Sequence, residues 1–214
     1  MNVFLKPEIA KNYDAYYNTT TGKKVNEIEE KLITEFLNEI PKSEMLELGC
    51  GTGHWTNIFV NHGFNVTAAD ISDEMLKLAK LKNIEAEFIK ADSQNIPFPD
   101  NSFSAVSSIT MLEFVNDQDK VINEIYRVLK PGGWLILGCL NKLSELGKNK
   151  ENDATFKDAK FLLKDDLEEK LRLFGNPQIK SGIFFSPTFE ILDNNSKKEN
   201  TEPAFIAAAV QKTK

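Results

Sequence analysis

Three glycines occupy alternate positions in the segment Leu46-Glu47-Leu48-Gly49-Cys50-Gly51-Thr52-Gly53-His54-Trp55. They follow a short apolar run and precede a segment with the apolar spacing of a helix. Glycine permits tight turns and lets a ligand approach the backbone closely, and the first turn of the following helix offers unpaired N–H groups. The segment therefore suits a nucleotide or nucleoside ligand, although a strand-to-helix turn with no ligand would have the same form.

Two acidic residues follow the next two predicted strands. Asp70 comes at the end of one strand, where a carboxylate can accept hydrogen bonds from the ribose hydroxyls of a nucleoside. Asp92 and Ser93 come at the end of the next strand, where they can meet the edge of an adenine ring. Ser72 is the expected cap of the helix that follows Asp70, which leaves Asp70 itself available for a sugar.

Comparison of the known glycine motifs narrows the class of ligand. A phosphate-binding P-loop requires Gly-Lys-Ser/Thr, whereas Gly53 is followed by His54 and Trp55. A nicotinamide site requires Gly-x-Gly-x-x-Gly, and the final glycine is replaced by His54 or Thr56, depending on where the count begins. A nucleoside without a pyrophosphate remains, and the acidic residues favour one with a positive charge.

Alternating strands and helices must position these residues. Strands are predicted over 45–48, 64–69, 85–91, 103–109 and 134–140, and helices over 55–61, 73–82 and 117–130, the last ended by Pro131-Gly132-Gly133. This alternation predicts a mostly parallel sheet with right-handed crossovers. Strands over 178–186 and 204–211 have no helix between them and should pair in antiparallel fashion.

The remaining segments flank this core. Residues 1–41 are predicted to be helical, with a break at 19–22 and an end at Pro41. Residues 141–163 are polar and irregular, with room for a short helix. A helix over 164–174 is capped by Gly175, and residues 192–203 form a polar loop. We expect one domain, with 1–41 as an N-terminal lid, 42–140 as the core, and 141–214 as a substrate-side segment and terminal hairpin.

The sequence between residues 43 and 140 resembles the class I S-adenosylmethionine-dependent methyltransferases. The glycine segment resembles their first motif, Val66-Thr67-Ala68-Ala69-Asp70-Ile71-Ser72 the second, and the segment 90–98 the third. Residues 103–115 and 127–133 resemble the later conserved stretches. The nearest group is the small-molecule type that resembles the ubiquinone and menaquinone biosynthesis enzymes. The resemblance implies an α/β, Rossmann-like fold with seven strands, an antiparallel last strand and helices on both faces.

The resemblance also implies roles for individual residues. The implied cofactor-binding residues are Tyr13, Glu47, Gly49, Gly51, Gly53, Asp70, Ile71, Asp92, Ser93, Ser108 and Ile109. The glycines would pass under the methionine part of S-adenosylmethionine, and Asp70 would bind its ribose. Ile71 would pack on the adenine, and Tyr13 would close over the cofactor.

Methyl transfer from a sulfonium needs alignment more than acid–base chemistry, so no catalytic triad is expected. A base is needed only for a protonated nucleophile, and the candidates are His54, Glu113 and Asp14. His54 has a structural alternative as a helix-start residue, and Glu113 as a solvated helix position. The family often has a histidine in the position of Phe114, so that source of a base is absent.

Composition excludes several classes of protein and partner. The net charge is −6, and the basic residues are scattered, which argues against nucleic acid as a substrate. No apolar run is long enough to span a membrane, no secretory signal precedes the core, and a cytoplasmic location is the default. Cys50 and Cys139 form no metal motif, and no metal is expected. We therefore expect a small-molecule acceptor; the sequence does not specify its identity or the oligomeric state.

Two other functions use the same motifs. The chain could be another enzyme on this cofactor fold, such as an aminopropyl transferase. It could also be a non-catalytic module that binds S-adenosylmethionine, with the irregular segment 141–163 contacting a partner. A nicotinamide enzyme is disfavoured by His54.

Overall fold

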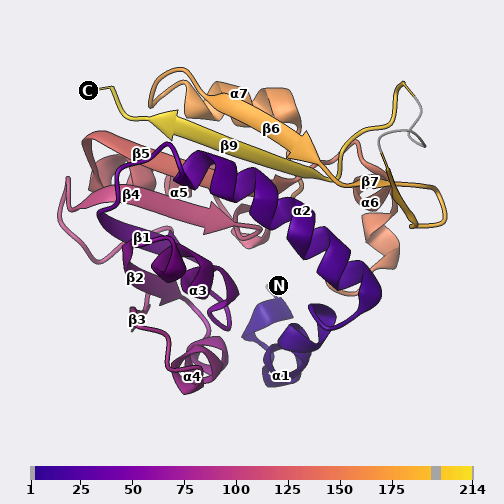
Figure 1. Cartoon of the computed structure of the whole chain (residues 1–214), viewed down its shortest axis with the longest axis horizontal. Coiled ribbons are helices and arrows are strands. Elements are labelled where there is room, and N and C mark those ends of the chain that lie inside the picture. Colours follow the sequence, from indigo (N-terminus) through magenta and orange to yellow (C-terminus); the bar gives the residue numbers. More distant parts are fainter. Residues whose placement is uncertain (1–2, 194–198, 214) are drawn as a thin grey trace.

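Seven strands form one sheet in the computed structural model, which describes residues 3–193 and 199–213. The strands are β1 (Glu44–Leu48), β2 (Asn65–Asp70), β3 (Glu87–Lys90), β4 (Phe103–Ile109), β5 (Leu129–Leu140), β6 (Gln178–Gly182) and β9 (Phe205–Gln211). Their order across the sheet is β3-β2-β1-β4-β5-β9-β6 (Figure 1). Within this sheet, as far as the described residues show it, β9 is the one strand antiparallel to its neighbours, β5 and β6. The predicted Rossmann-like sheet with an antiparallel last strand is confirmed.

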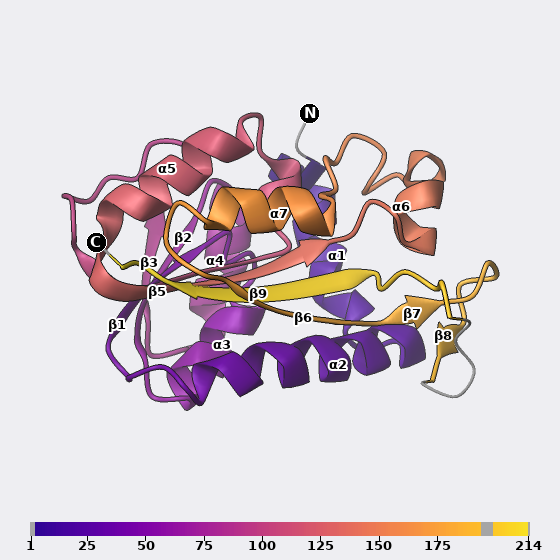
Figure 2. The ribbon, with the colours of Figure 1, turned by 90° about the horizontal axis from the view of Figure 1, so that it is seen from above.

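Helices cover both faces of the sheet, as predicted. Figure 2 shows α2 (Thr20–Leu37) and α3 (His54–Asn61) on one side and α5 (Gln118–Val128) and α7 (Lys164–Leu171) on the other. Leu76 of α4 (Asp73–Leu81) joins the apolar cluster that contains residues of α2 and α3. Each face therefore has its own hydrophobic core.

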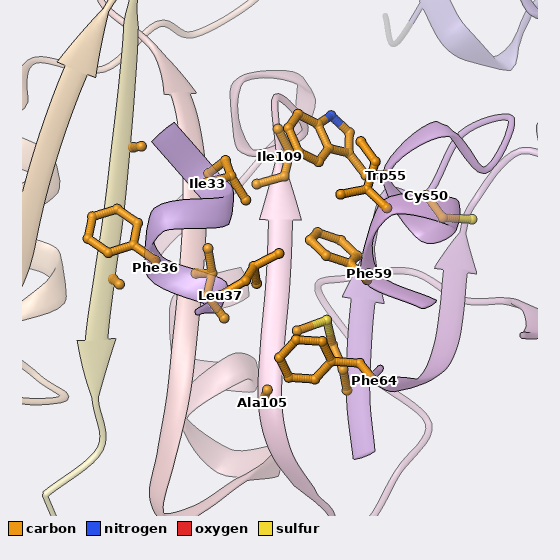
Figure 3. Close-up of a cluster of buried hydrophobic side chains, with 14 of the residues drawn as sticks. Ile33, Phe36, Leu37, Cys50, Trp55, Phe59, Phe64, Ala105 and Ile109 are labelled. Atoms are coloured by element: carbon orange, nitrogen blue, oxygen red, sulfur yellow. The ribbon is translucent and has the colours of Figure 1, made fainter. Parts of the chain in front are cut away.

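The strands supply both cores because successive side chains of a strand point to opposite faces. In β5, Ile136 packs with the α2 and α3 side, while Leu135 and Leu137 pack with the α5 and α7 side. Figure 3 shows part of the first core, where Phe36 of α2 and Phe59 of α3 both lie against the sheet. Burial of these side chains fixes the register of the strands and therefore the positions of the loops that follow them.

The carboxyl ends of the parallel strands share one edge of the sheet, and several short helices lie near this edge. They are η1 (Val3–Leu5), α1 (Pro7–Tyr16), η2 (Leu112–Phe114), α6 (Glu145–Asn149) and η3 (Lys150–Asn152). α1 has its main contacts with α4 and η1, and Figure 1 shows it beside α4. No described helix is both long enough and apolar enough to cross a membrane.

The break in the N-terminal helices is shorter than predicted. Thr19 caps α2, because its side-chain oxygen accepts a hydrogen bond from the Gly22 N–H at 2.9 Å. Gly22 therefore lies inside the first turn of α2. A side chain there would come within 2.0 Å of the Tyr16 carbonyl oxygen, so the glycine permits close contact between α1 and α2 instead of ending a helix.

Three other predicted boundaries are wrong. The helix expected over 117–130 ends at Val128, because Pro131 cannot continue it and residues from Leu129 onward already belong to β5. The helix expected over 164–174 ends at Leu171. The strand expected over 178–186 divides at Ile183, whose φ of 61° is left-handed. Beyond it, β7 (Phe184–Phe185) pairs with β8 (Ile191–Leu192), while residues 194–198 of the expected loop lie outside the described residues.

Candidate active site

One large cavity lies at the carboxyl edge of the sheet. Its volume is about 880 Å³, within the range of small-molecule sites. The ends of β1 to β5 form its floor, and α1, α2 and the segment that contains η3 contribute to its walls. The lining includes eight of the residues to which the sequence assigned cofactor binding: Tyr13, Gly49, Gly51, Asp70, Ile71, Asp92, Ser93 and Ile109.

The glycine loop is shaped for close approach to the cavity. Gly49 has a φ of 78°, and the N–H groups of Gly49 and Cys50 both donate to the Ala69 carbonyl, at 2.8 and 3.0 Å. A side chain at Gly49 would lie 2.3 Å from Cγ of Met111, whereas one at Gly51 would meet only the Tyr13 ring at 3.9 Å. The loop therefore presents bare backbone to the cavity, with the Tyr13 ring above it.

Asp70 connects the second strand with this loop. One carboxylate oxygen accepts from the Gly51 N–H and the other from the Ser72 N–H, both at 2.8 Å. Burial raises the pKa of Asp70, and these backbone hydrogen bonds oppose the shift. Ser72 is the cap of α4, as predicted. A carboxylate has about four acceptor sites, so Asp70 can also accept from the hydroxyls of a sugar in the cavity.

The edge expected to meet adenine is formed by the turn after β3. Asp92 accepts from the Gln94 N–H at 2.8 Å, and the Ser93 hydroxyl lies 3.7 Å from the sulfur of Met111. Ile71 lines the same part of the cavity and is 42% exposed. An exposed apolar side chain between two acidic strand ends is suited to pack against a planar ring.

The remaining three implied cofactor residues do not line the cavity. Glu47 is buried in the sheet and accepts from the Thr56 hydroxyl at 2.6 Å, and burial raises its pKa to about 8. Gly53 faces α4 and the segment after it, because a side chain there would meet Ala79 at 3.4 Å and Ile84 at 2.8 Å. The Ser108 hydroxyl is buried and has no hydrogen-bond partner among the described residues. Of the alternatives Ser108 and Ile109, the cavity contains Ile109.

The three candidate bases also lie outside the lining of the large cavity. His54 stacks on Tyr17 at 4.0 Å and lies 2.6 Å from the Asn26 side-chain oxygen; burial and the charge of Lys82 lower its pKa to about 4. Asp14 accepts from the Thr52 hydroxyl and forms an ion pair with Lys82. Glu113 accepts from the Leu140 N–H and lines a separate hollow of about 50 Å³; burial raises its pKa to about 7.

Asp14 joins the lid to the glycine loop. One carboxylate oxygen accepts from the Thr52 hydroxyl at 2.5 Å, and the other lies 2.8 Å from the Lys82 ammonium. Lys82 also donates to the Thr52 hydroxyl at 3.2 Å. These three side chains, here called the Asp14 latch, hold α1 over the cavity.

Glu29 and Thr110 are among the cavity residues to which the sequence assigned no role. Glu29 lies on α2 and is one of the residues that line the cavity. Its signal was available, because it occupies the buried face between Val25 and Ile33, at helical spacing. Thr110, at the end of β4, also lines the cavity and has a φ of 49°. Nothing in the local sequence indicates that strained backbone.

The donor set suits a nucleoside and not a metal. No group of three or more His, Cys, Asp or Glu side chains within residues 3–193 and 199–213 could hold a metal ion. Cys50 is buried, and burial raises the pKa of its thiol, so a nucleophilic thiolate is not available. Acidic strand ends beside a bare glycine loop define a Rossmann-like site for a nucleoside cofactor.

Comparison with known proteins identifies the family. The methyltransferase domain family matches residues 46–137. An uncharacterized protein of Methanocaldococcus jannaschii is 35% identical over 219 residues, which cover 99% of this chain and all of that protein. A demethylmenaquinone methyltransferase of Renibacterium salmoninarum is 36% identical over 107 residues, which cover 50% of this chain and 45% of that enzyme.

Solved structures agree with this result at the level of the fold. A methyltransferase of Thermotoga maritima, described as S-adenosylmethionine-dependent and as a possible histamine N-methyltransferase, has a TM-score of 0.75. It is 24% identical, and the match covers 97% of this chain and 98% of that one. The chain belongs to the S-adenosylmethionine-dependent methyltransferases, and its cofactor is S-adenosylmethionine.

Proposed function

We propose that this chain transfers the methyl group of S-adenosylmethionine to a small-molecule acceptor by in-line displacement. The observation that supports this proposal is the continuity of the cavity. It extends from the acidic ends of β2 and β3 to an apolar region that includes Phe114, Phe156 and Phe185. One end suits the adenosine, and the other end offers space for a second molecule.

The cofactor supplies a methyl group that is already activated by the positive charge on sulfur. The protein must hold this group and the acceptor in line and exclude water. In this proposal Asp70 and Asp92, which line the cavity, bind the adenosine, and the rest of the cofactor lies against the backbone of the glycine loop. α1, held by the Asp14 latch, contributes one wall of the cavity in which the transfer would occur.

The size and enclosure of the site support a small acceptor. The apolar wall includes side chains of η2, of the segment after α6 and of β7. A cavity of about 880 Å³ has room for a metabolite beside the cofactor.

A transfer assay would test the proposed function. The purified chain would be incubated with S-adenosylmethionine labelled in the methyl group and with fractionated metabolite extract. We expect label in one or a few small products, and none with heat-treated protein. Label found only in protein or nucleic acid would contradict a small-molecule acceptor. Cofactor binding without any transfer would favour the non-catalytic module instead.

A further inference from the structure

The charged residues that line the cavity have one sign. The described lining contains five acidic residues, Glu8, Glu29, Asp70, Asp92 and Asp153, and it contains no lysine, arginine or histidine. An anionic acceptor would therefore find no cationic side chain in this wall. A cation would be attracted to every charged group that it meets.

Glu29 is distinguished from the other carboxylates by burial and by the lack of a partner. Its side chain is in the lining of the cavity, yet only 9% of the residue is exposed. It makes no hydrogen bond or ion pair with any residue in the described part of the chain. A largely buried carboxylate without a protein partner is unfavourable, so a cationic ligand that supplies a partner would gain free energy on binding.

Three tyrosines, two in α1 and one directly after it, lie close enough to feel the charge of this carboxyl group. Tyr13, Tyr16 and Tyr17 all line the cavity, and the charge of Glu29 contributes to the raised pKa of each of them. Their rings contact one another, with centroids 5.9 Å apart for Tyr13 and Tyr17 and 5.7 Å for Tyr16 and Tyr17. Aromatic faces attract organic cations, most strongly where water is excluded.

Glu29 lies away from the residues that suit the adenosine. α2, which carries it, packs against β5, β6 and β9, at the opposite side of the sheet from β2 and β3. Asp70 and Asp92 follow β2 and β3. Glu29 is therefore in the half of the cavity that remains for the acceptor, and Tyr13, whose ring lies over Gly51, borders both halves.

We propose that the acceptor is a basic organic amine, whose positive charge is held by Glu29 among Tyr13, Tyr16 and Tyr17. This inference rests on the proposed methyl transfer, because it assigns the substrate class of the same site. It makes Glu29 a binding and specificity residue. It also explains an acid on the buried face of α2, which has no role in the fold that the described contacts show.

Binding of a cation should change the protonation of Glu29. Without a ligand, burial and then the charge of Glu113 raise the pKa of Glu29 to about 8, so the group is mostly protonated at pH 7. The other titratable groups facing it are Tyr13, Tyr16 and Tyr17, and none of them supplies a positive charge. A bound ammonium favours the carboxylate. Amine binding at pH 7 should therefore release up to about one proton.

The test uses three probes of similar size and different charge. The full chain is first saturated with S-adenosylhomocysteine, so that the adenosine half is filled. Calorimetric titrations then compare phenylethylamine, phenylethanol and 3-phenylpropanoate, in buffers of different ionisation enthalpy. We expect the amine to bind at least about tenfold more tightly than the alcohol (about 1.4 kcal/mol), with proton release, and the acid to bind most weakly.

Variants of α2 assign the preference to one residue. Glu29→Gln should bind the amine and the alcohol with similar affinity and should release no proton. Its affinity for S-adenosylhomocysteine should stay within about twofold of the original, which also shows that the variant is folded. Glu27→Gln removes the same charge from an exposed position of the same helix, and it should retain the preference for the amine.

Several results would overturn the inference. These are equal affinity for the three probes, preference for the acid, or no amine binding at millimolar concentration. A Glu29→Gln variant that lost S-adenosylhomocysteine binding but kept the amine preference would show that Glu29 binds the cofactor instead. If S-adenosylhomocysteine did not bind to the original chain, the proposed function itself would fail.

Discussion

Side chains with the same chemical group have different roles in this site because their surroundings differ. Asp70 is held by backbone N–H groups and faces the cavity, while Asp14 is paired with Lys82 and Thr52. Glu47 is buried with a single hydroxyl partner, and Glu29 has none among the described residues. At the residue scale, hydrogen-bond partners and access to the cavity separate binding groups from structural groups.

Replacement of Asp70 should weaken cofactor binding. We expect Asp70→Ala to reduce the affinity for S-adenosylmethionine by about 1–3 kcal/mol, because hydrogen bonds to an ionised acceptor are lost. The change would also release the Gly51 N–H from its partner. Calorimetric titration of the variant and the original chain would measure the difference.

Asp73 provides the matched control for that experiment. It lies three residues further along the chain, in the first turn of α4, and its exposed carboxylate pairs with Lys90 at 2.5 Å. Asp73→Ala should leave cofactor affinity within about twofold of the original, since exposed ion pairs contribute little. Equal affinity of all three proteins would count against Asp70 as the ribose-binding residue.

At the element scale, the position of α1 depends on few contacts. Its main contacts are with α4 and η1, and the Asp14 latch connects it to the glycine loop. Both charged groups of the latch are partly exposed, at 35% for Lys82 and 45% for Asp14, so their pair should contribute at most about 1 kcal/mol. Such an element can open locally while the sheet stays folded.

Removal of the latch should therefore loosen α1 selectively. We expect Asp14→Ala to speed hydrogen exchange of the amides of α1 severalfold and to leave the exchange of β1, β4 and β5 unchanged. Lys11→Ala alters an exposed residue of the same helix that has no such connection, and it should have no effect. Unchanged exchange in α1 of the Asp14 variant would show that other contacts hold this helix.

The elements of the core were predictable from the sequence because each has a clear period. β4 was predicted with its observed bounds, and the hairpin of β6 and β9 followed from the absence of a helix between them. Backbone conformations and side-chain positions that depend on tertiary contacts were not predictable from the sequence. The left-handed backbone at Ile183 divides a regular apolar run. His54 stacks on Tyr17 and does not line the cavity.

For the whole molecule, buried carboxyl groups make stability depend on pH. Burial raises the pKa of Glu29 and Glu47 to about 8 and that of Glu113 to about 7, whereas unfolded glutamate has a pKa of about 4.3. The folded state therefore binds more protons than the unfolded state between these values. The free energy of unfolding should fall as pH rises from about 5 to about 8.

Urea denaturation at several pH values would measure this dependence. Glu47→Gln should reduce its slope by up to about 1.4 kcal/mol per pH unit, because the amide oxygen can still accept from Thr56 and the group no longer titrates. Glu44→Gln, at an exposed position of the same strand, should leave the slope unchanged. A Glu47 variant with the original slope would indicate that Glu47 is ionised in the folded protein.

The uniform sign of the cavity lining has a consequence for turnover. The fresh methyl donor carries a positive sulfur, and the spent donor carries a neutral thioether, so walls with only acidic charges discriminate between them electrostatically. Methyl transfer should therefore weaken the electrostatic attraction between the cavity and S-adenosylhomocysteine, the product of the cofactor. Replacement of the neutral product by a new, positively charged cofactor would then be energetically favourable.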